Sequence, residues 1–102
     1  MYKSNNNKNY ILKKSTRKGK RFEIDMNDMS HHFGSEDGKT YIDGRTNKEK
    51  DAWIARHKKD KNFNNKHSGI YYSRHLLWSE PTLKEAIKKL EKKDKIKIKI
   101  DI

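Results

Sequence analysis

The sequence predicts an α+β fold in which a small antiparallel sheet packs against two or three short helices. Strict alternation of apolar and polar residues predicts strands toward both ends of the chain, at 22–26 and 95–102. Two capping sequences, at 46–49 and 82–85, predict where helices begin. A length of 102 residues suits one domain, so strands and helices are expected to share one core.

The first 26 residues are predicted to form a basic arm followed by a hairpin. Residues 1–9 are polar and basic and include three consecutive asparagines, so we expect a flexible arm ahead of a domain spanning 10–102. A strand begins at Tyr10. The alternating stretch 22–26 follows a turn at 18–20, which is typical of a hairpin.

A second hairpin is expected next. His31 to Phe33 lead into a turn at 34–38, where Asp37-Gly38 is a strong turn signal, and 40–42 return as a short strand. The adjacent histidines His31 and His32 would then point to opposite sides of the sheet.

The second half of the chain is predicted to hold the helices. A helix that starts after Thr46 places Trp53 and His57 one turn apart, and a polar loop at 60–67 follows with Phe63 as its anchor. Segment 70–78 is apolar nearly all round, which is typical of a buried helix.

The third helix and the last strand have the clearest periodicities. After the cap at Thr82 the apolar residues recur with helical spacing, at Leu83, Ala86, Ile87 and Leu90. In 95–102 four isoleucines alternate with three lysines and an aspartate, which predicts a half-buried strand. The lysine row also opposes pairing with the edge of another sheet.

Composition excludes several classes of protein. The longest apolar run is 76–78, far short of the roughly 20 residues of a membrane-spanning helix, and residues 1–20 lack the apolar core of a secretory signal. The absence of cysteine excludes disulfides, thiolate nucleophiles and cysteine-ligated zinc. We therefore expect a soluble protein without membrane contact.

Charge is the main functional signal. The chain has 26 Lys+Arg against 14 Asp+Glu, a net charge of +12. Basic residues concentrate at 1–20, 45–66 and 84–99, whereas 21–43 holds two basic and six acidic residues. Such an excess is typical of binding to phosphates, and the acidic stretch is a possible docking face for a basic protein.

Non-enzymatic binding of nucleic acid, DNA rather than RNA, is the first function that we predict. It would use phosphate contacts without reading sequence. The expected contacts lie on the first hairpin and after the first helix: Lys13, Lys14, Arg17, Lys18, Lys20, Lys58, Lys59 and Lys61. An alternative reading stays open, because 21 Lys, 10 Ile and 9 Asn are also what an A/T-rich genome encodes, and the lysines would then only solvate the surface.

A metal-dependent nuclease is a further hypothesis. The five histidines have no strong metal-binding spacing, although His32, His57 and Asp43 would form a hydrolytic site if the fold brought them together. No metal or other cofactor is otherwise expected.

Arg74 lies in the most apolar segment and needs a partner. We favour an internal salt bridge to Asp43, Asp51 or Glu80. The alternative is an anion clamp that Arg74 forms with Arg56 and the loop at Gly69.

A longer pattern of residues carries a resemblance to a known family. The pattern runs from His32-Phe33-Gly34 through Tyr41 and Asp43 to Pro81-Thr82-Leu83, and covers roughly 31–90. It resembles that of the small uncharacterised basic proteins of nucleocytoplasmic large DNA viruses. The residues of the pattern that we single out are His32, Phe33, Gly34, Arg56, His57, Gly69, Ser73, Arg74, Trp78 and Pro81.

The resemblance implies a setting rather than an activity. It implies a protein of the virion or of the host-cell virus factory, in cytoplasm or nucleus, with nucleic acid or viral structural proteins as partners. A minor capsid or cement protein that staples larger subunits is the alternative to a genome-associated protein. The pattern residues look more like determinants of the fold than like catalytic groups, and the oligomeric state stays open.

Overall fold

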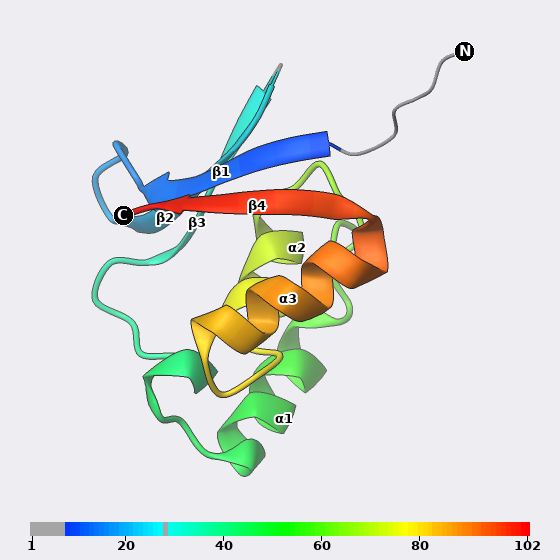
Figure 1. Cartoon of the computed structure of the whole chain (residues 1–102). Coiled ribbons are helices and arrows are strands. Elements are labelled where there is room, and N and C mark those ends of the chain that lie inside the picture. Colours follow the sequence, from blue (N-terminus) through cyan, green and yellow to red (C-terminus); the bar gives the residue numbers. More distant parts are fainter. Residues whose placement is uncertain (1–7, 28) are drawn as a thin grey trace.

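The computed structural model describes residues 8–27 and 29–102, which form a four-stranded sheet with helices on one side (Figure 1). The strands are β1 (Lys8–Lys14), β2 (Lys20–Met26), β3 (Met29–Ser35) and β4 (Ile96–Asp101). The helical elements are η1 (Tyr41–Asp43), α1 (Asn47–His57), α2 (Gly69–Tyr72), the π-helical η2 (Ser73–Leu77) and α3 (Leu83–Asp94). The predicted α+β class is confirmed.

The strand order is β3-β2-β1-β4, and one of the three pairings differs from the expected antiparallel arrangement. β1–β2 and β2–β3 are antiparallel hairpin pairs, whereas β4 lies parallel to β1, with Tyr10 opposite Ile98. The chain crosses the sheet through the helices before β4, and this crossover makes a parallel pair possible.

β1 begins at Lys8, two residues before the predicted start, so Lys8 and Asn9 belong to the sheet rather than to an arm. The rest of the predicted arm, residues 1–7, lies outside the described residues. β1 is an inner strand of the sheet, with β2 and β4 as its neighbours.

The strand predicted at 40–42 is wrong. Tyr41–Asp43 form a 3₁₀ turn, and β3 takes β2 as its partner instead. The carboxylate of Asp43 accepts hydrogen bonds from the backbone N–H and the hydroxyl of Thr40, each at 2.9 Å, and these bonds close the turn. Gly44 ends it with a φ of 99°, a left-handed conformation that glycine adopts without strain.

Both predicted helix caps are confirmed. The hydroxyl of Thr46 accepts a hydrogen bond from the N–H of Glu49, and that of Thr82 accepts one from the N–H of Glu85, each at 3.1 Å. The segment predicted as one buried helix, 70–78, runs as α2 and then η2, so its second half is wound more loosely than an α-helix.

The core lies between the sheet and the helices α2, η2 and α3. Its largest fully buried side chains are Tyr71, Tyr72, Phe33, Leu12, Ile24, Leu76, Leu77 and Leu90. α1 has no buried residue and lies farthest from β1 and β4 in Figure 1, below α2 and α3. Within the described part of the chain, no helix is long and apolar enough to cross a membrane.

Candidate nucleic-acid interface

A pocket of about 590 Å³ lies between β3, α1 and the α2–η2 segment. Residues that are far apart in the sequence converge on it, and seven of the ten residues singled out in the viral pattern line it: His32, Phe33, Gly34, His57, Gly69, Ser73 and Trp78. The pattern residues therefore share a place in the fold that their spacing along the chain does not indicate.

Two glycines allow α2 to lie directly against β3. A Cβ atom on Gly69 would stand 2.6 Å from the backbone oxygen of His32, too close for any side chain. Gly34 has a φ of 79°, and a Cβ atom there would stand 2.9 Å from Cδ1 of Leu77. Both glycines allow β3 and the α2–η2 segment to approach each other closely, which shapes the pocket. Packing therefore explains why these two positions hold glycine.

Stacked rings form the wall of the pocket on the α1 side. Trp53 lies on Trp78 with ring centroids 5.2 Å apart, and His57 lies on Trp53 with centroids 4.2 Å apart. The Nδ1 atom of His57 is 2.8 Å from the carbonyl oxygen of Trp53. Because a carbonyl only accepts hydrogen bonds, Nδ1 of His57 carries a proton.

Of the eight predicted phosphate-binding residues, one lines this pocket, and the group after α1 begins next to another lining residue. Lys20, at the end of the β1–β2 turn, lines it, as does His57, which ends α1 and precedes Lys58. Seven of the eight predicted residues are exposed and form no ion pair with any described residue: Lys14, Arg17, Lys18, Lys20, Lys58, Lys59 and Lys61.

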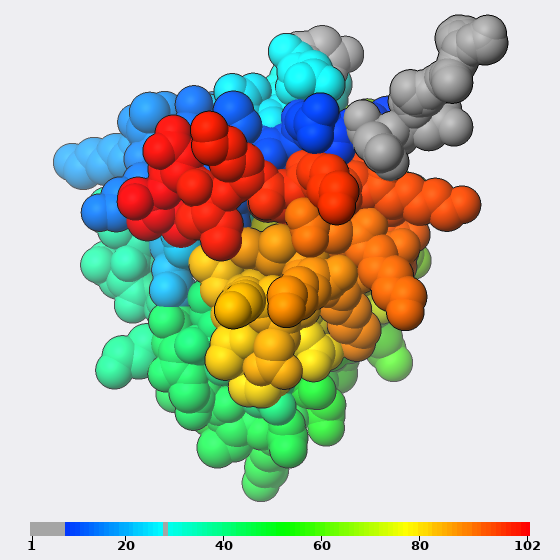
Figure 2. All heavy atoms as spheres, viewed as in Figure 1, coloured from blue at the N-terminus to red at the C-terminus, as the bar shows by residue number. Residues whose placement is uncertain are grey.

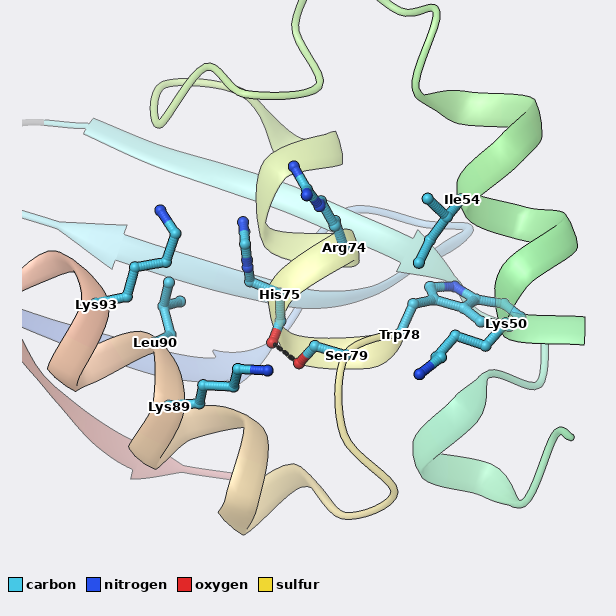
Figure 3. A pocket seen from close by; sticks show the side chains of 9 residues that line it. All are labelled: Lys50, Ile54, Arg74, His75, Trp78, Ser79, Lys89, Leu90 and Lys93. Atoms are coloured by element: carbon cyan, nitrogen blue, oxygen red, sulfur yellow. Dashed lines mark hydrogen bonds between the residues drawn. The ribbon is translucent and has the colours of Figure 1, made fainter. Parts of the chain in front are cut away.

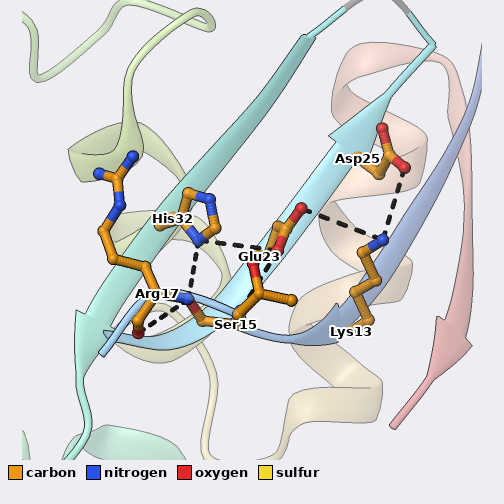
Figure 4. Close-up of polar contacts among 7 residues, drawn as sticks. Lys13, Ser15, Arg17, Glu23, Asp25 and His32 are labelled. Carbon is orange, nitrogen blue, oxygen red and sulfur yellow. Dashed lines mark hydrogen bonds and ion pairs between the residues drawn. The ribbon is translucent and has the colours of Figure 1, made fainter. Parts of the chain in front are cut away.

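Lys13 differs from these seven. Its Nζ atom lies 3.7 Å from a carboxylate oxygen of Asp25 and 4.0 Å from one of Glu23, on the face of the sheet turned away from the helices (Figure 4). Two carboxylates already neutralise this lysine, so Lys13 is a weaker phosphate ligand than the sequence suggested.

The two adjacent histidines point to opposite sides of β3, as predicted. His31 lies opposite Ile24 and stacks on Tyr72, on the helix side. His32 lies opposite Glu23, and its Nδ1 is 2.7 Å from the hydroxyl of Ser15 and 3.7 Å from a carboxylate oxygen of Glu23 (Figure 4). The imidazole of His32 is thus held by the first hairpin.

Internal partners neutralise much of the acidic stretch 21–43. Glu23 and Asp25 lie beside Lys13, and Asp43 accepts two hydrogen bonds from the guanidinium of Arg21, at 2.5 and 2.8 Å. The hydrogen bond from Arg21 lowers the pKa of Asp43 to about 2. Three of the six acids are therefore committed to the fold, which weakens the idea of an acidic docking face.

Neither expectation for Arg74 holds. Its guanidinium donates to the side-chain oxygen of Asn64 at 2.6 Å and lies 4.2 Å from the ring centroid of Phe63, and it has no carboxylate partner among the described residues. Arg56, Arg74 and Gly69 line three different cavities, so they form no clamp. Phe63 is buried and anchors its loop as predicted.

The hypothetical metal ligands do not assemble. His32 is held by Ser15, His57 stacks on Trp53, and Asp43 binds Arg21. Across residues 8–27 and 29–102 there is no group of three histidine or acidic side chains placed to hold a metal ion. Pro81, the remaining residue of the pattern, is exposed and directly precedes the cap of α3.

Sequence reasoning missed two residues of the pocket, Lys39 and Thr40. Lys39 precedes and Thr40 begins the short strand that was predicted to follow the Asp37-Gly38 turn, and no local pattern indicates that this segment borders a cavity. Lys39 is exposed and adds a further cationic group to the rim beside Lys20.

Fold and pocket together define a small α+β protein with a cleft bordered by basic residues. Residues 10–57, which include most of β1, all of β2 and β3, and α1, match the model of a family of unknown function, DUF5754. The match covers the basic residues of the first hairpin and ends just before Lys58, Lys59 and Lys61. No curated protein and no solved structure matches the chain.

Proposed function

We propose that this protein binds nucleic acid, DNA in preference to RNA, through phosphate contacts that do not read the base sequence. The observation that carries the proposal is the set of seven exposed cationic side chains, without ion pairs to described residues, on the β1–β2 hairpin and directly after α1; of these seven, Lys20 also lines the pocket. Exposed lysines and arginines without partners release counterions from a polyanion at little cost to the fold.

The arrangement favours backbone contacts over base readout. The cationic groups lie on a hairpin turn and on the segment after α1, and neither element is a helix or ribbon of the length that usually enters a major groove. The aromatic rings of the pocket stack on one another, with Trp78 only 9% exposed, so they pack the fold rather than offering open faces to bases.

The setting that we propose is the virion or virus factory of a large DNA virus. The resemblance of the pattern in 31–90 supports it, and a non-specific DNA-binding protein suits a particle that packs a genome. The proposed function is binding alone, with no catalytic step assigned to any residue.

The test is binding to a fluorescent duplex and to a single strand between 50 and 300 mM salt. If the seven cations act together, log affinity for the duplex falls with log salt at a slope of about −4 or steeper. Because β1 is an inner strand, the variants are substitutions rather than removal of residues 1–20. The triple variant Arg17→Gln, Lys18→Gln, Lys20→Gln should make the slope shallower by about 2–3.

The matched control removes the same charge from the exposed face of α3, by Lys84→Gln, Lys88→Gln and Lys92→Gln. An equal loss of DNA affinity in both triple variants would show that binding depends on the overall charge of the protein and not on this surface. Binding that vanishes by 150 mM salt would redirect the search to viral structural proteins as partners. Cleavage of the strand with Mg²⁺, Mn²⁺ or Zn²⁺ would instead support the nuclease hypothesis.

A further inference from the structure

A second cavity, separate from the pocket described above, lies between α1, η2 and α3 (Figure 3). Its volume is about 280 Å³, close to the lower end of the roughly 300–1,000 Å³ typical of small-ligand pockets. In Figure 3, Lys89 and Lys93 come from α3, Arg74 and His75 from η2, and Lys50 from α1. Four cationic side chains from three elements therefore line one small cavity.

None of the described residues that line this cavity carries a carboxylate. The nearest acids bind its lysines from outside: Glu80 lies 3.0 Å from Nζ of Lys89, and Asp94 lies 3.5 Å from Nζ of Lys93. Both lysines are more than half exposed, so these contacts are weak and exchangeable. An anion that entered the cavity would find cations in excess, with Glu80 as its main competitor.

His75, which also lines the cavity, lies among these positive charges. Burial is the main reason that the pKa of His75 falls to about 4, and the charges of Arg74, Lys93 and Lys89 lower it further, opposed by Asp94. The ring of Tyr71 packs on the imidazole with centroids 4.4 Å apart. At neutral pH the imidazole is therefore uncharged, and a bound anion would raise its pKa.

Of the remaining lining residues, Ile54, Trp78 and Leu90 are apolar, and Ser79 already donates its hydroxyl to the carbonyl oxygen of His75. A ligand that fills the cavity would thus combine an anionic group with a flat or apolar part. Lysine and arginine together are the usual ligands of phosphate.

We propose that this cavity binds a phosphate ester of nucleotide size, with the phosphate held by Arg74, Lys89 and Lys93 and the remainder of the ligand against the apolar lining at Ile54 and Leu90. The phosphate belongs to a free nucleotide or to the 5′ end of a strand, which are two sources of one chemistry. The site shares none of the seven cations of the proposed nucleic-acid interface, so it does not rest on that function.

The experiment is an NMR titration of the full chain with AMP, pyrophosphate and adenosine, following the imidazole of His75. AMP and pyrophosphate should bind and raise the pKa of His75 by about 1 pH unit, whereas adenosine should do neither. Equal binding of adenosine and AMP, or an unchanged His75, would overturn the proposal. Strands with and without a 5′ phosphate then distinguish a strand end from a free nucleotide.

Two variants with opposite expected effects on AMP affinity make the test sharper. Lys89→Gln combined with Lys93→Gln should weaken AMP binding by about tenfold, because two charged hydrogen bonds to phosphate are lost. Glu80→Gln should tighten it by about two- to fivefold, because the competing carboxylate is removed. A loss of affinity in Glu80→Gln would contradict the proposed site.

The control variants make the same charge changes elsewhere, with Lys88→Gln and Lys92→Gln, which do not line the cavity, against the lysine pair and Glu36→Gln against Glu80→Gln. Equal effects in the controls would show a general charge effect and overturn the site. The triple variant Arg17→Gln, Lys18→Gln, Lys20→Gln should keep its AMP affinity while it loses salt-dependent DNA binding, so failure of one proposal is distinguishable from failure of the other.

Discussion

Trp53 of α1 and Trp78, which directly follows η2, stack with ring centroids 5.2 Å apart and planes within 12° of parallel. α1 has no buried residue, so this stack, extended by His57 and by Phe63, is its principal apolar attachment to the core. Trp78 lines both cavities, and Trp53 lines the larger of the two. Loss of the stack should therefore loosen α1 and open both sites together.

Replacement of Trp53 by alanine tests this attachment. We expect Trp53→Ala to lower the free energy of unfolding by about 2–3 kcal/mol, less than for a fully buried tryptophan because Trp53 is half-buried. Hydrogen exchange should show lost protection over 47–57 while β1 and β2 keep theirs. Trp53→Phe, which retains a ring, should recover most of the stability. Unchanged protection of α1 in Trp53→Ala would contradict the assignment.

Alanine substitutions at two glycines, Gly69 and Gly19, distinguish the cost of a steric clash from the cost of backbone strain. Gly69→Ala should destabilise the fold by more than about 2 kcal/mol, because its Cβ would meet the backbone oxygen of His32 at 2.6 Å. Gly19 has a φ of 86°, and a Cβ atom there would meet no other atom within 4 Å, so Gly19→Ala should cost only about 1 kcal/mol of conformational strain. Urea unfolding of both variants gives the comparison, and a Gly69→Ala variant as stable as Gly19→Ala would disprove the close packing of α2 on β3.

Features that depend on neighbouring residues were predictable from the sequence. The caps at Thr46 and Thr82 each need only a glutamate three residues later, and the β1–β2 hairpin needs only alternation and a turn. The 3₁₀ turn was not predictable, because it depends on Asp43, whose carboxylate also binds Arg21 from a strand 22 residues away. The turn signal at Asp37-Gly38, on which the predicted strand depended, says nothing of that distant partner.

The candidate sites depend even more on distant contacts. The basic residues near the first turn and after α1 were predictable as groups, whereas the pocket that Lys20 and His57 line depends on how α1 packs through Trp78. The predicted salt bridge of Arg74 to a carboxylate was wrong. The guanidinium instead contacts the side-chain amide of Asn64 and the ring of Phe63, both in the preceding loop. The parallel pairing of β4 with β1 likewise requires knowledge of the crossover.

The pair formed by Arg21 and Asp43 makes stability depend on pH. The pKa of Asp43 is about 2 in the folded protein, below its usual value near 3.8, chiefly because Arg21 donates hydrogen bonds to it. A lowered folded-state pKa stabilises the fold above the unfolded value, and this contribution is lost as the pH falls from about 4 to about 2. Its size is about 1–2 kcal/mol, since both side chains are about one quarter exposed.

Urea unfolding of Asp43→Asn at pH 5 and pH 2 measures that contribution. The variant should be less stable than the unmodified chain at pH 5, and the difference should largely vanish at pH 2, where the carboxylate itself becomes protonated. Arg21→Gln supplies the control, because Asp43→Asn should add little further loss in that background. An undiminished difference at pH 2 would show that the asparagine disturbs the turn at Thr40 rather than the ion pair.

The exposed edge of β4 carries the last prediction. β4 is an edge strand, and its first two isoleucines, Ile96 and Ile98, are buried while Ile100 is 50% exposed. α3 and β4 lie next to each other on the face shown in Figure 2, where α3 is orange and β4 is red, and the carboxylate of Glu91 in α3 accepts a hydrogen bond from the N–H of Ile98 at 2.8 Å. Glu91 therefore occupies the first part of this edge, and the exposed residues follow it. The exposed Lys97 and Lys99 alternate with these isoleucines. An edge of this kind pairs with other chains unless like charges keep them apart.

Replacement of both lysines by threonine, which favours strands, should therefore produce dimers or larger aggregates. Light scattering and size-exclusion chromatography at several protein concentrations would measure it. Lys88→Thr with Lys92→Thr removes the same charge from the exposed face of α3 and should leave the association state unchanged. If the two double variants aggregate alike, the lysines act only through the net charge of the protein. If neither does, the twist of β4 or its isoleucine row already prevents pairing, and the alternating lysines have no protective effect at this edge.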